Sequence, residues 1–398
     1  MNAVKRAIRF AFSKGLTVAR VWAGKRDARR HGTPRRILIV DGAHVGDLVI
    51  ATGLLPVLKA AFPGVEIGFV VGSWSSSVLK GHPDVAHVHL LDHWRPNRSK
   101  ASRWAIWMRH MKTQYQCLKE LRAVKYDWAI CLHPYYPDLI PLAWWAGIPV
   151  RIAFSDAVFA PLATHIAPYA GLDRTITQGQ CFAELLQAAG IEKRYTEMRK
   201  GDLPPDTTAA LSELHTLLEH CIDKPLPRFV IVHMGAGSQA REWPTEFWRE
   251  VVEPLTMHAE VLLTGVSERE RANAEAVGAG LSRCRNACGR LTWQGMVTAV
   301  RHAEEIFTVD TSISHVAAAV ETPCQVVATG ISFIARWRPD EKVALVWSNP
   351  VPCSPCYRAN GCKTMECKKG VRPSDLLGNS LVMLGAGGQG GDAIDQHG

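Results

Sequence analysis

Short apolar runs alternate with longer helical patterns along the first half of the chain. The runs have the length and composition of buried strands and cover Arg36–Val40 and residues 65–71, 85–91, 128–132 and 149–153. Helical patterns lie at about residues 47–62, which Pro63-Gly64 ends, and at residues 99–124. Strands that alternate with helices predict a parallel α/β sheet.

The same alternation begins again after a polar, proline-bearing stretch at residues 192–227. We expect further strands at Phe229–His233, Glu260–Thr264, Ile306–Val309 and 325–328, and helices at 244–257, 267–281, about 293–302, from about Ser314 and after Pro373. This predicts two α/β domains, residues 36–200 and 201–384. Residues 385–398 are Gly-rich and are expected to be a disordered tail.

Charge is unevenly distributed along the chain. Residues 1–36 hold 11 Lys and Arg and one Asp, whereas the other 362 residues hold 35 bases and 36 acids. The net charge of +9 and the pI near 9.0 therefore come from an N-terminal extension. Because the body is electrically balanced, no nucleic-acid partner is expected for it.

The extension, residues 1–35, has a basic amphipathic pattern over residues 4–23. An apolar stripe that includes Ile8, Phe12 and Leu16 lies opposite a row of arginines. Such helices lie on anionic membrane surfaces. Two alternatives remain open: a solvated tail whose stripe packs on the body, and a mitochondrial transit peptide.

No segment has the length of a membrane span. The longest run without Asp, Glu, Lys or Arg, residues 157–172, is 16 long and contains Pro161 and Pro168. Lys14 and Arg20 interrupt any apolar core of a secretory signal peptide. We therefore expect a soluble, cytoplasmic protein.

The turn after the first strand, residues 41–47, is the first candidate functional segment. Ligands of open α/β sheets bind at the carboxyl ends of strands. Gly46 is expected to allow a tight turn, and Asp47 to stand at the N-terminus of the next helix. The Asp47 carboxylate is either an N-cap or a general base, and the two roles are compatible.

A glycine turn follows the first strand of the second half. Backbone N–H groups around Gly235 and Gly237 can hold a phosphate, and Arg241 adds a planar cation that suits a diphosphate. Gly235, Gly237 and Ala240 also match a dinucleotide fingerprint loosely.

A second anion site is predicted after the strand Ile306–Val309. Asp310, Thr311 and Ser312 turn the chain into a small-residue helix, and His315 lies in its first turn. A lone His at such a position is usually structural, but Asp310, Thr311 and His315 converge on one helix N-terminus.

Four cysteines occur within 15 residues: Cys353, Cys356, Cys362 and Cys367. Their spacing differs from a standard zinc site with two paired knuckles. We expect a structural clip, formed either by a bound metal such as zinc or by disulfides, with no catalytic role.

These segments together resemble glycosyltransferase family 9, the ADP-heptose lipopolysaccharide heptosyltransferases. The matching motifs are the strand with Gly46-Asp47, the apolar course that ends in Ala61-Phe62-Pro63, Gly81-His82-Pro83-Asp84-Val85, Arg241-Glu242-Trp243-Pro244 and the segment from Asp310 to Ala319. The resemblance covers roughly residues 36–384.

The resemblance implies a GT-B fold, in which two Rossmann-like parallel-sheet domains face a central cleft. It implies an inverting, metal-independent transfer of a heptose from ADP-heptose to a lipopolysaccharide-core or related lipid-linked glycan. No cofactor beyond the nucleotide sugar is required. Asp47 would be the base, with His44 and Gly46 on the acceptor side. The donor site would include Gly235, Gly237, Arg241, Asp310, Thr311, Ser312 and His315, with Glu268 as a ribose contact.

We also expect a monomer, held at the cytoplasmic face of the inner membrane by residues 1–35. The residues alone leave two other functions open. One is an NAD-dependent oxidoreductase that uses residues 235–240. The other is a non-enzymatic nucleic-acid-binding protein that uses the cysteine segment and the basic extension.

Overall fold

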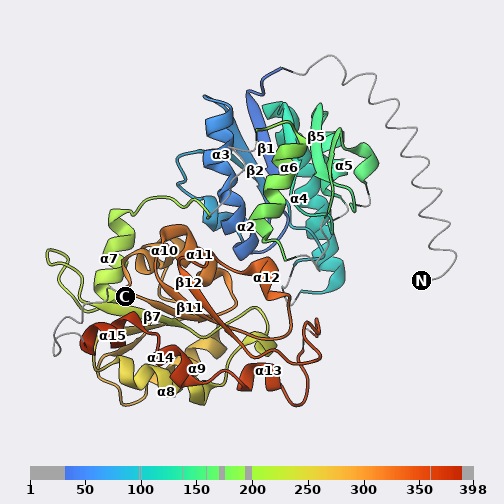
Figure 1. The fold of residues 1–398 in the computed structure, drawn as a ribbon. Helices are drawn as coiled ribbons and strands as arrows, with labels where there is room; N and C mark the ends of the chain where they lie inside the picture. The colour runs from blue at the N-terminus through green and yellow to red at the C-terminus, as the bar shows by residue number, and fades with distance from the viewer. Residues whose placement is uncertain are drawn as a thin grey trace, which may run out of the picture. The chain divides into compact units, whose positions relative to one another are not determined.

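The structure, a computed structural model, describes residues 32–97, 99, 101–136, 138–157, 159–169, 175–192, 200–358 and 360–387. The chain divides into two compact units, the first ending at Pro204 and the second beginning at Pro205. Each unit contains a six-stranded parallel sheet with helices on both faces (Figure 1). The amphipathic helix predicted at residues 4–23 lies outside the described residues.

The sheet of the first unit has the order β3-β2-β1-β4-β5-β6. Its strands are β1 (Arg36–Val40), β2 (Glu66–Val71), β3 (Val85–Leu90), β4 (Trp128–Cys131), β5 (Val150–Phe154) and β6 (His165–Ala167). Its helices are α2 (Val45–Thr52), α3 (Leu54–Ala61), α4 (Arg103–Val124), α5 (Leu139–Trp145) and α6 (Gln178–Ala188). Residues 37–40 of the central strand are fully buried, because both faces of the sheet are covered.

The sheet of the second unit has the order β12-β11-β10-β7-β8-β9. Its strands are β7 (Phe229–His233), β8 (Glu260–Thr264), β9 (Cys284–Asn286), β10 (Ile306–Val309), β11 (Cys324–Ala328) and β12 (Ala344–Ser348). Its helices are α7 (Thr208–Leu217), α8 (Thr245–Leu255), α9 (Glu268–Gly278), α10 (Trp293–His302), α11 (Ser312–Val320), α12 (Ile334–Trp337), α13 (Glu366–Lys369), α14 (Pro373–Leu377) and α15 (Leu381–Gly387). In Figure 1, α7, α10 and α11 cover one face of the sheet, while α8, α9 and α14 cover the other.

Counted along each unit, both sheets have the strand order 3-2-1-4-5-6. This is the order of the doubly wound Rossmann fold. The order reverses between β1 and β4 in the first unit and between β7 and β10 in the second. Ligands of such sheets bind at the carboxyl ends of the strands at these two switch points.

Each unit has its own hydrophobic core. In the first, Leu38 and Val40 of β1 pack with Leu139 and Leu142 of α5. In the second, Trp248 of α8 is buried among strand residues and meets Trp243 edge-to-face, with ring centroids 4.9 Å apart. Two separate cores explain why the chain divides into two units.

The short segment before Pro204 is attached to the first unit. The Asp202 N–H donates to Thr52 Oγ1 at 2.8 Å, at the end of α2. A Cβ on Gly201 would lie 2.2 Å from the Val49 carbonyl oxygen, so only glycine fits at this close approach.

Every predicted strand is present, but several elements were not predicted. Among them, α7 lies inside the stretch predicted as a domain boundary. Thr207 caps it by accepting the Ala210 N–H, and Leu214 and Leu217 are buried. The expected tail is also shortened, because α15 extends to Gly387; residues 388–398 lie outside the described chain.

Candidate active site

The first switch point brings the turn after β1 next to the end of β4. Asp41 Oδ1 accepts the Ala43 N–H and lies 2.9 Å from His133 Nε2. Asp41 and His133 are both buried. The other carboxylate oxygen, Asp41 Oδ2, is buried and has no hydrogen-bond partner among the described residues. A buried acceptor without a partner is costly, so this position suits a ligand hydroxyl or a water molecule.

Asp47 is the third residue of α2, and His44 is the N-cap. The Asp47 carboxylate reaches back and accepts the His44 N–H at 3.2 Å. Asp47 therefore stands in the first turn of the helix, as expected, but it is not the N-cap; from the third helical position it satisfies a free N–H of the helix end. Gly46 lies inside α2, so the tight turn expected there is made by residues 41–44 instead.

Burial raises the pKa of Asp47 to about 6. The charge of His133 opposes this shift, and the charge of Asp41 adds to it. The hydrogen bond from the His44 N–H also favours the charged carboxylate. A carboxylate with a pKa near 6 can accept a proton at neutral pH more readily than an ordinary surface aspartate.

A group of rings and carboxylates that was not predicted lies beside this pair. Ring centroids are 5.8 Å apart for His133 and Tyr136, and 5.2 Å for Tyr136 and His93. His93 and His110 both contact the Asp138 carboxylate. Burial works to raise the pKa of Asp138, but the hydrogen bonds from the two histidines outweigh it and hold the pKa well below its usual range.

The sequence did contain a sign of these residues. His133 follows β4 and His93 follows β3, as Asp41 follows β1. The strand-end rule that singled out the turn at residues 41–47 applies equally to them.

In the second unit, the glycine turn packs closely against α9. A Cβ on Gly235 would lie 1.5 Å from Glu270 Oε1, so this position requires glycine. Glu270 Oε2 accepts the N–H groups of Val266 and Ser267 and the Ser267 hydroxyl. Burial works to raise the pKa of Glu270, but these hydrogen bonds lower it overall. Gly237 is exposed.

Glu268, predicted to be a ribose contact, is the first residue of α9. Its side chain is 81 % exposed and pairs with Arg271 on the same helix. Glu270, which was not among the predicted residues, lies against the glycine turn. The Ser267-x-x-Glu270 capping box was the sequence pattern that could have identified it.

Arg241 and Asp310 meet at the second switch point. Arg241 lies in a short 3-10 helix (Gln239–Arg241), and its Nη1 is 3.6 Å from Asp310 Oδ2. The Ser332 hydroxyl donates to the same oxygen at 3.2 Å. The predicted pair of segments after β7 and β10 is therefore brought together in one unit.

Thr311 is the N-cap of α11 and has an extended backbone, while Ser312 begins the helix. His315 is buried, and burial lowers its pKa while Asp310 opposes this. The N–H groups at the start of α11 are aligned for an anion.

The turn at residues 235–240 does not have the geometry of a dinucleotide-binding turn. Such a turn must open a helix directly after the glycines. Here α8 begins only at Thr245, with Pro244 as its N-cap. The nicotinamide alternative loses its structural basis.

The predicted cysteine clip is also not formed. All eleven cysteines are free thiols, and no group of His, Cys, Asp or Glu in the described chain is placed to hold a metal ion. Hydrogen bonds hold this segment: the Cys356 N–H donates to the Gly330 carbonyl, and the Trp243 indole Nε1–H donates to the Lys368 carbonyl. Cys367 is buried, Cys356 and Cys362 are half-buried, and Cys353 is exposed.

Two doubly wound sheets, each with polar groups at its switch point, define an α/β enzyme fold of the Rossmann type. The family model of glycosyltransferase family 9 (heptosyltransferase) matches residues 115–366. The chain belongs to this family and is a glycosyltransferase.

Relatives with established names agree with this assignment. Lipopolysaccharide heptosyltransferase 1 of Pseudomonas aeruginosa is 26 % identical over 337 residues, which are 81 % of this chain and 86 % of that protein. Lipopolysaccharide heptosyltransferase 3 of Escherichia coli is 21 % identical over 76 % of this chain and 85 % of its own length.

A solved structure has the same fold. The E. coli ADP-heptose lipopolysaccharide heptosyltransferase II matches with a TM-score of 0.69 and 18 % identity, over 88 % of this chain and 99 % of the other. The E. coli heptosyltransferase WaaC, solved with ADP, matches with a TM-score of 0.59 and 18 % identity, over 79 % of this chain and 93 % of the other. The predicted GT-B type, with two Rossmann-like domains, is confirmed.

In the described part of the chain no helix is both long and apolar enough to cross a membrane.

Proposed function

We propose that this chain is an inverting heptosyltransferase. It transfers heptose from ADP-heptose to the lipopolysaccharide core or to a related lipid-linked glycan. The observation that carries the proposal is family membership over residues 115–366. The names of its relatives and the fold shared with an ADP-bound enzyme support the choice of donor and acceptor.

In this mechanism Asp47 deprotonates the acceptor hydroxyl. The raised pKa of Asp47 supports this role, because it lies close to neutral pH. Asp47 precedes the residues matched by the family model, so its role rests on the geometry of the turn after β1 and on the motif resemblance. The unpartnered oxygen of Asp41 would accept a second hydroxyl of the acceptor and orient it.

The second unit stabilises the leaving group. Negative charge develops on the ADP diphosphate as the glycosidic bond breaks. Arg241 and the N–H groups at the start of α11 provide positive potential at the second switch point, which is how a transferase can work without a metal ion. Donor binding would draw Arg241 away from Asp310 toward the diphosphate.

Asp47→Asn tests the base. We expect kcat to fall at least about 100-fold, because general-base catalysis contributes this much or more. ADP affinity, measured by calorimetry, should stay unchanged, since the donor site lies in the other unit. Asp156→Asn, at an exposed carboxylate of the same unit, is the matched control and should be fully active. Full activity of Asp47→Asn would remove Asp47 as the base.

We further propose that residues 1–35 hold the enzyme on an anionic membrane surface. The surplus of ten positive charges within residues 1–36 supports this. Deletion of residues 1–35 should weaken binding to vesicles of phosphatidylglycerol and leave ADP binding intact. Unchanged vesicle binding would favour the alternative of a tail that packs on the body.

A further inference from the structure

Helix α4 has a row of large apolar side chains that face solvent. Trp104, Trp107, Met108, Met111 and Tyr115 are between 42 % and 73 % exposed. The rings of Trp104 and Trp107 stack on each other, with centroids 5.4 Å apart. We call this row the α4 aromatic face. Exposed apolar patches of this kind usually mark an interaction surface.

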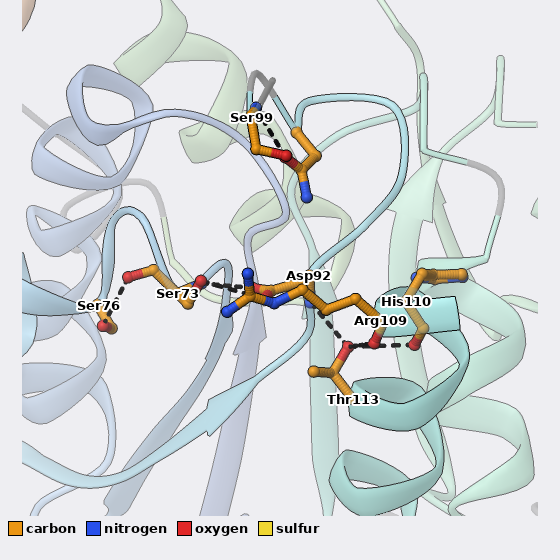
Figure 2. Close-up of polar contacts among 8 residues, drawn as sticks. Ser73, Ser76, Asp92, Ser99, Arg109, His110 and Thr113 are labelled. Atoms are coloured by element: carbon orange, nitrogen blue, oxygen red, sulfur yellow. Dashed lines mark hydrogen bonds and ion pairs between the residues drawn. The ribbon is translucent and has the colours of Figure 1, made fainter. Parts of the chain in front are cut away.

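The opposite side of α4 is fixed to the unit, so the aromatic face cannot turn inward. His110, Cys117 and Leu121 are buried on that side. Figure 2 shows Asp92, Arg109 and Thr113 joined in one network. The Asp92 N–H donates to Thr113 Oγ1 at 3.0 Å, and the Arg109 guanidinium lies 2.8 Å from the Asp92 carboxylate. Asp92 also accepts from Ser73, which ties α4 to the loop after β2.

The chain segment that carries the aromatic face is basic in sequence. Residues 94–119 contain seven Lys and Arg and no Asp or Glu. A groove of about 410 Å³ beside the face is lined by Trp94, Arg103, Ile106 and Trp107. The Arg95 guanidinium lies 5.3 Å from the centroid of the Trp94 ring. Aromatic rings flanked by cations are typical of surfaces that enter the headgroup region of a bilayer.

The face begins at the edge of the sheet that carries the candidate base. The N-terminus of α4 follows β3, and in a parallel sheet this places it at the carboxyl edge, where Asp41 and Asp47 also lie. Ring contacts link the groove beside the face to the residues around His133. The His93 and Trp94 rings stack with centroids 5.7 Å apart, and His93 also lies beside Tyr136. A lipid-linked substrate would therefore emerge from a bilayer at this face close to Asp47.

Three occupants of this face can be compared by their charge: residues 1–36 of the same chain, a second copy of the chain, and an anionic lipid surface. Residues 1–36, with a surplus of ten positive charges, would be repelled by cations of this segment such as Arg95, Arg103 and Lys112. A second copy would oppose the same cations with its own. An anionic lipid surface meets neither obstacle, because each Lys or Arg near such a surface is attracted to it.

We propose that the α4 aromatic face is a second membrane-contact surface, which inserts Trp104 and Trp107 into the headgroup region of an anionic bilayer. This surface is separate from residues 1–35. The test of this surface requires neither donor nor acceptor. The membrane-contact proposal can therefore fail while the transferase proposal holds, and the transferase proposal can fail while this one holds.

The test is flotation of the full chain with vesicles of phosphatidylglycerol and phosphatidylcholine. The variant Trp104→Ser/Trp107→Ser/Tyr115→Ser should partition at least about tenfold more weakly than the wild type, because it removes three rings of roughly 150–250 Å² each from the contact. Trp145→Ser and Met257→Ser, at other exposed side chains, should bind like the wild type. ADP affinity should be unchanged in all variants, which shows that the second unit remains folded.

A second variant measures insertion directly. Trp104→Phe/Trp107→Phe keeps the apolar area and should still bind. Brominated lipid should quench wild-type tryptophan emission more than the emission of this variant. Equal quenching, or unchanged flotation of the triple serine variant, would overturn the proposal. Equal binding of the wild type to vesicles of pure phosphatidylcholine would also overturn it. So would a mass measurement in which the wild type is a dimer and the triple serine variant a monomer, because the face would then be a dimer interface. If acrylamide fails to reach the two rings in the absence of vesicles, the face is covered by another part of the chain and the proposal is wrong.

Discussion

Two groups, His133 and Asp41, act on the pKa of Asp47 in opposite directions, and this balance affects its chemistry. Burial alone would push its pKa upward, His133 restrains the shift and Asp41 reinforces it. His133 and Asp41 are themselves joined across the first switch point. A change at either residue should therefore act on the reaction through the proton affinity of Asp47.

We expect a pH profile that reports this carboxylate. If Asp47 is the base, log kcat/KM should fall with unit slope as the pH drops below about 6, because the carboxylate becomes protonated. His133→Gln removes a group that favours the charged form, so the inflection should move to higher pH. Initial rates from pH 4.5 to 8.5 measure this. A shift to lower pH would contradict the assigned role of His133.

The same residue should trade stability for activity. Its pKa is higher in the folded state, about 6, than the ordinary 3.8, so the ionised form favours unfolding. This penalty is absent below about pH 4, develops between the two pKa values and is complete above about pH 6. Asp47→Asn should therefore raise Tm by roughly 2 °C or more at pH 7.5 and leave it unchanged at pH 4. Thermal unfolding followed by circular dichroism at both pH values is the measurement, and a lower Tm at pH 7.5 would count against it.

At the scale of elements, the start of α11 is arranged so that its backbone can bind an anion. Thr311, the N-cap, has φ −149° and ψ 176°, which is an extended conformation. Ser312 is the first residue of the helix. The first N–H groups of a helix have no partner within it. The small buried residues of α11, Ala317 and Ala318 among them, let the helix pack closely on the sheet.

Proline at position 312 tests whether a backbone N–H binds the donor. Proline is tolerated at the first helical position, and the extended Thr311 suits a following proline, so Ser312→Pro should fold. It removes one N–H and should weaken ADP binding about tenfold, as loss of one charge-assisted hydrogen bond does. Ser312→Ala keeps the N–H and is the matched control. If both variants bind ADP equally, the amide has no such role.

Elements were predictable where burial makes a simple pattern. Buried parallel strands such as β1 and β7 are continuous apolar runs, and their bounds match the sequence prediction. Helix α5 is only seven residues long and contains Pro141, and α7 follows Pro204-Pro205, so neither had a clear pattern.

The contacts of the site were harder to predict than its members. Asp47 and Arg241 could be identified from turns that follow strands. The pairs Asp41–His133 and Arg241–Asp310 depend on which strands are neighbours. Only the strand order places β4 beside β1 and β10 beside β7, and one sequence does not reveal that order.

At the scale of the whole molecule, each unit has its own sheet and core. Units with separate cores need not unfold together. The proposed donor site lies wholly in the second unit, so ADP should stabilise only the second unit.

Scanning calorimetry should resolve two transitions. ADP at 100 times its Kd should stabilise one of them by about 2.7 kcal/mol and leave the other in place. Trp248→Ala, in the core of the second unit, should lower the transition that ADP raises. A single transition that ADP shifts as a whole would show that the units do not unfold separately.

The repeated strand order also has an evolutionary consequence. Because each half is a complete Rossmann fold with its own pair of polar residues at the switch point, substitutions in one half leave the other half's sheet intact. With the proposed donor site in one half and the proposed base in the other, lineages could change the sugar nucleotide and the acceptor glycan independently. A chimera that joins the first half of this chain to the second half of a relative should inherit its donor preference from the relative.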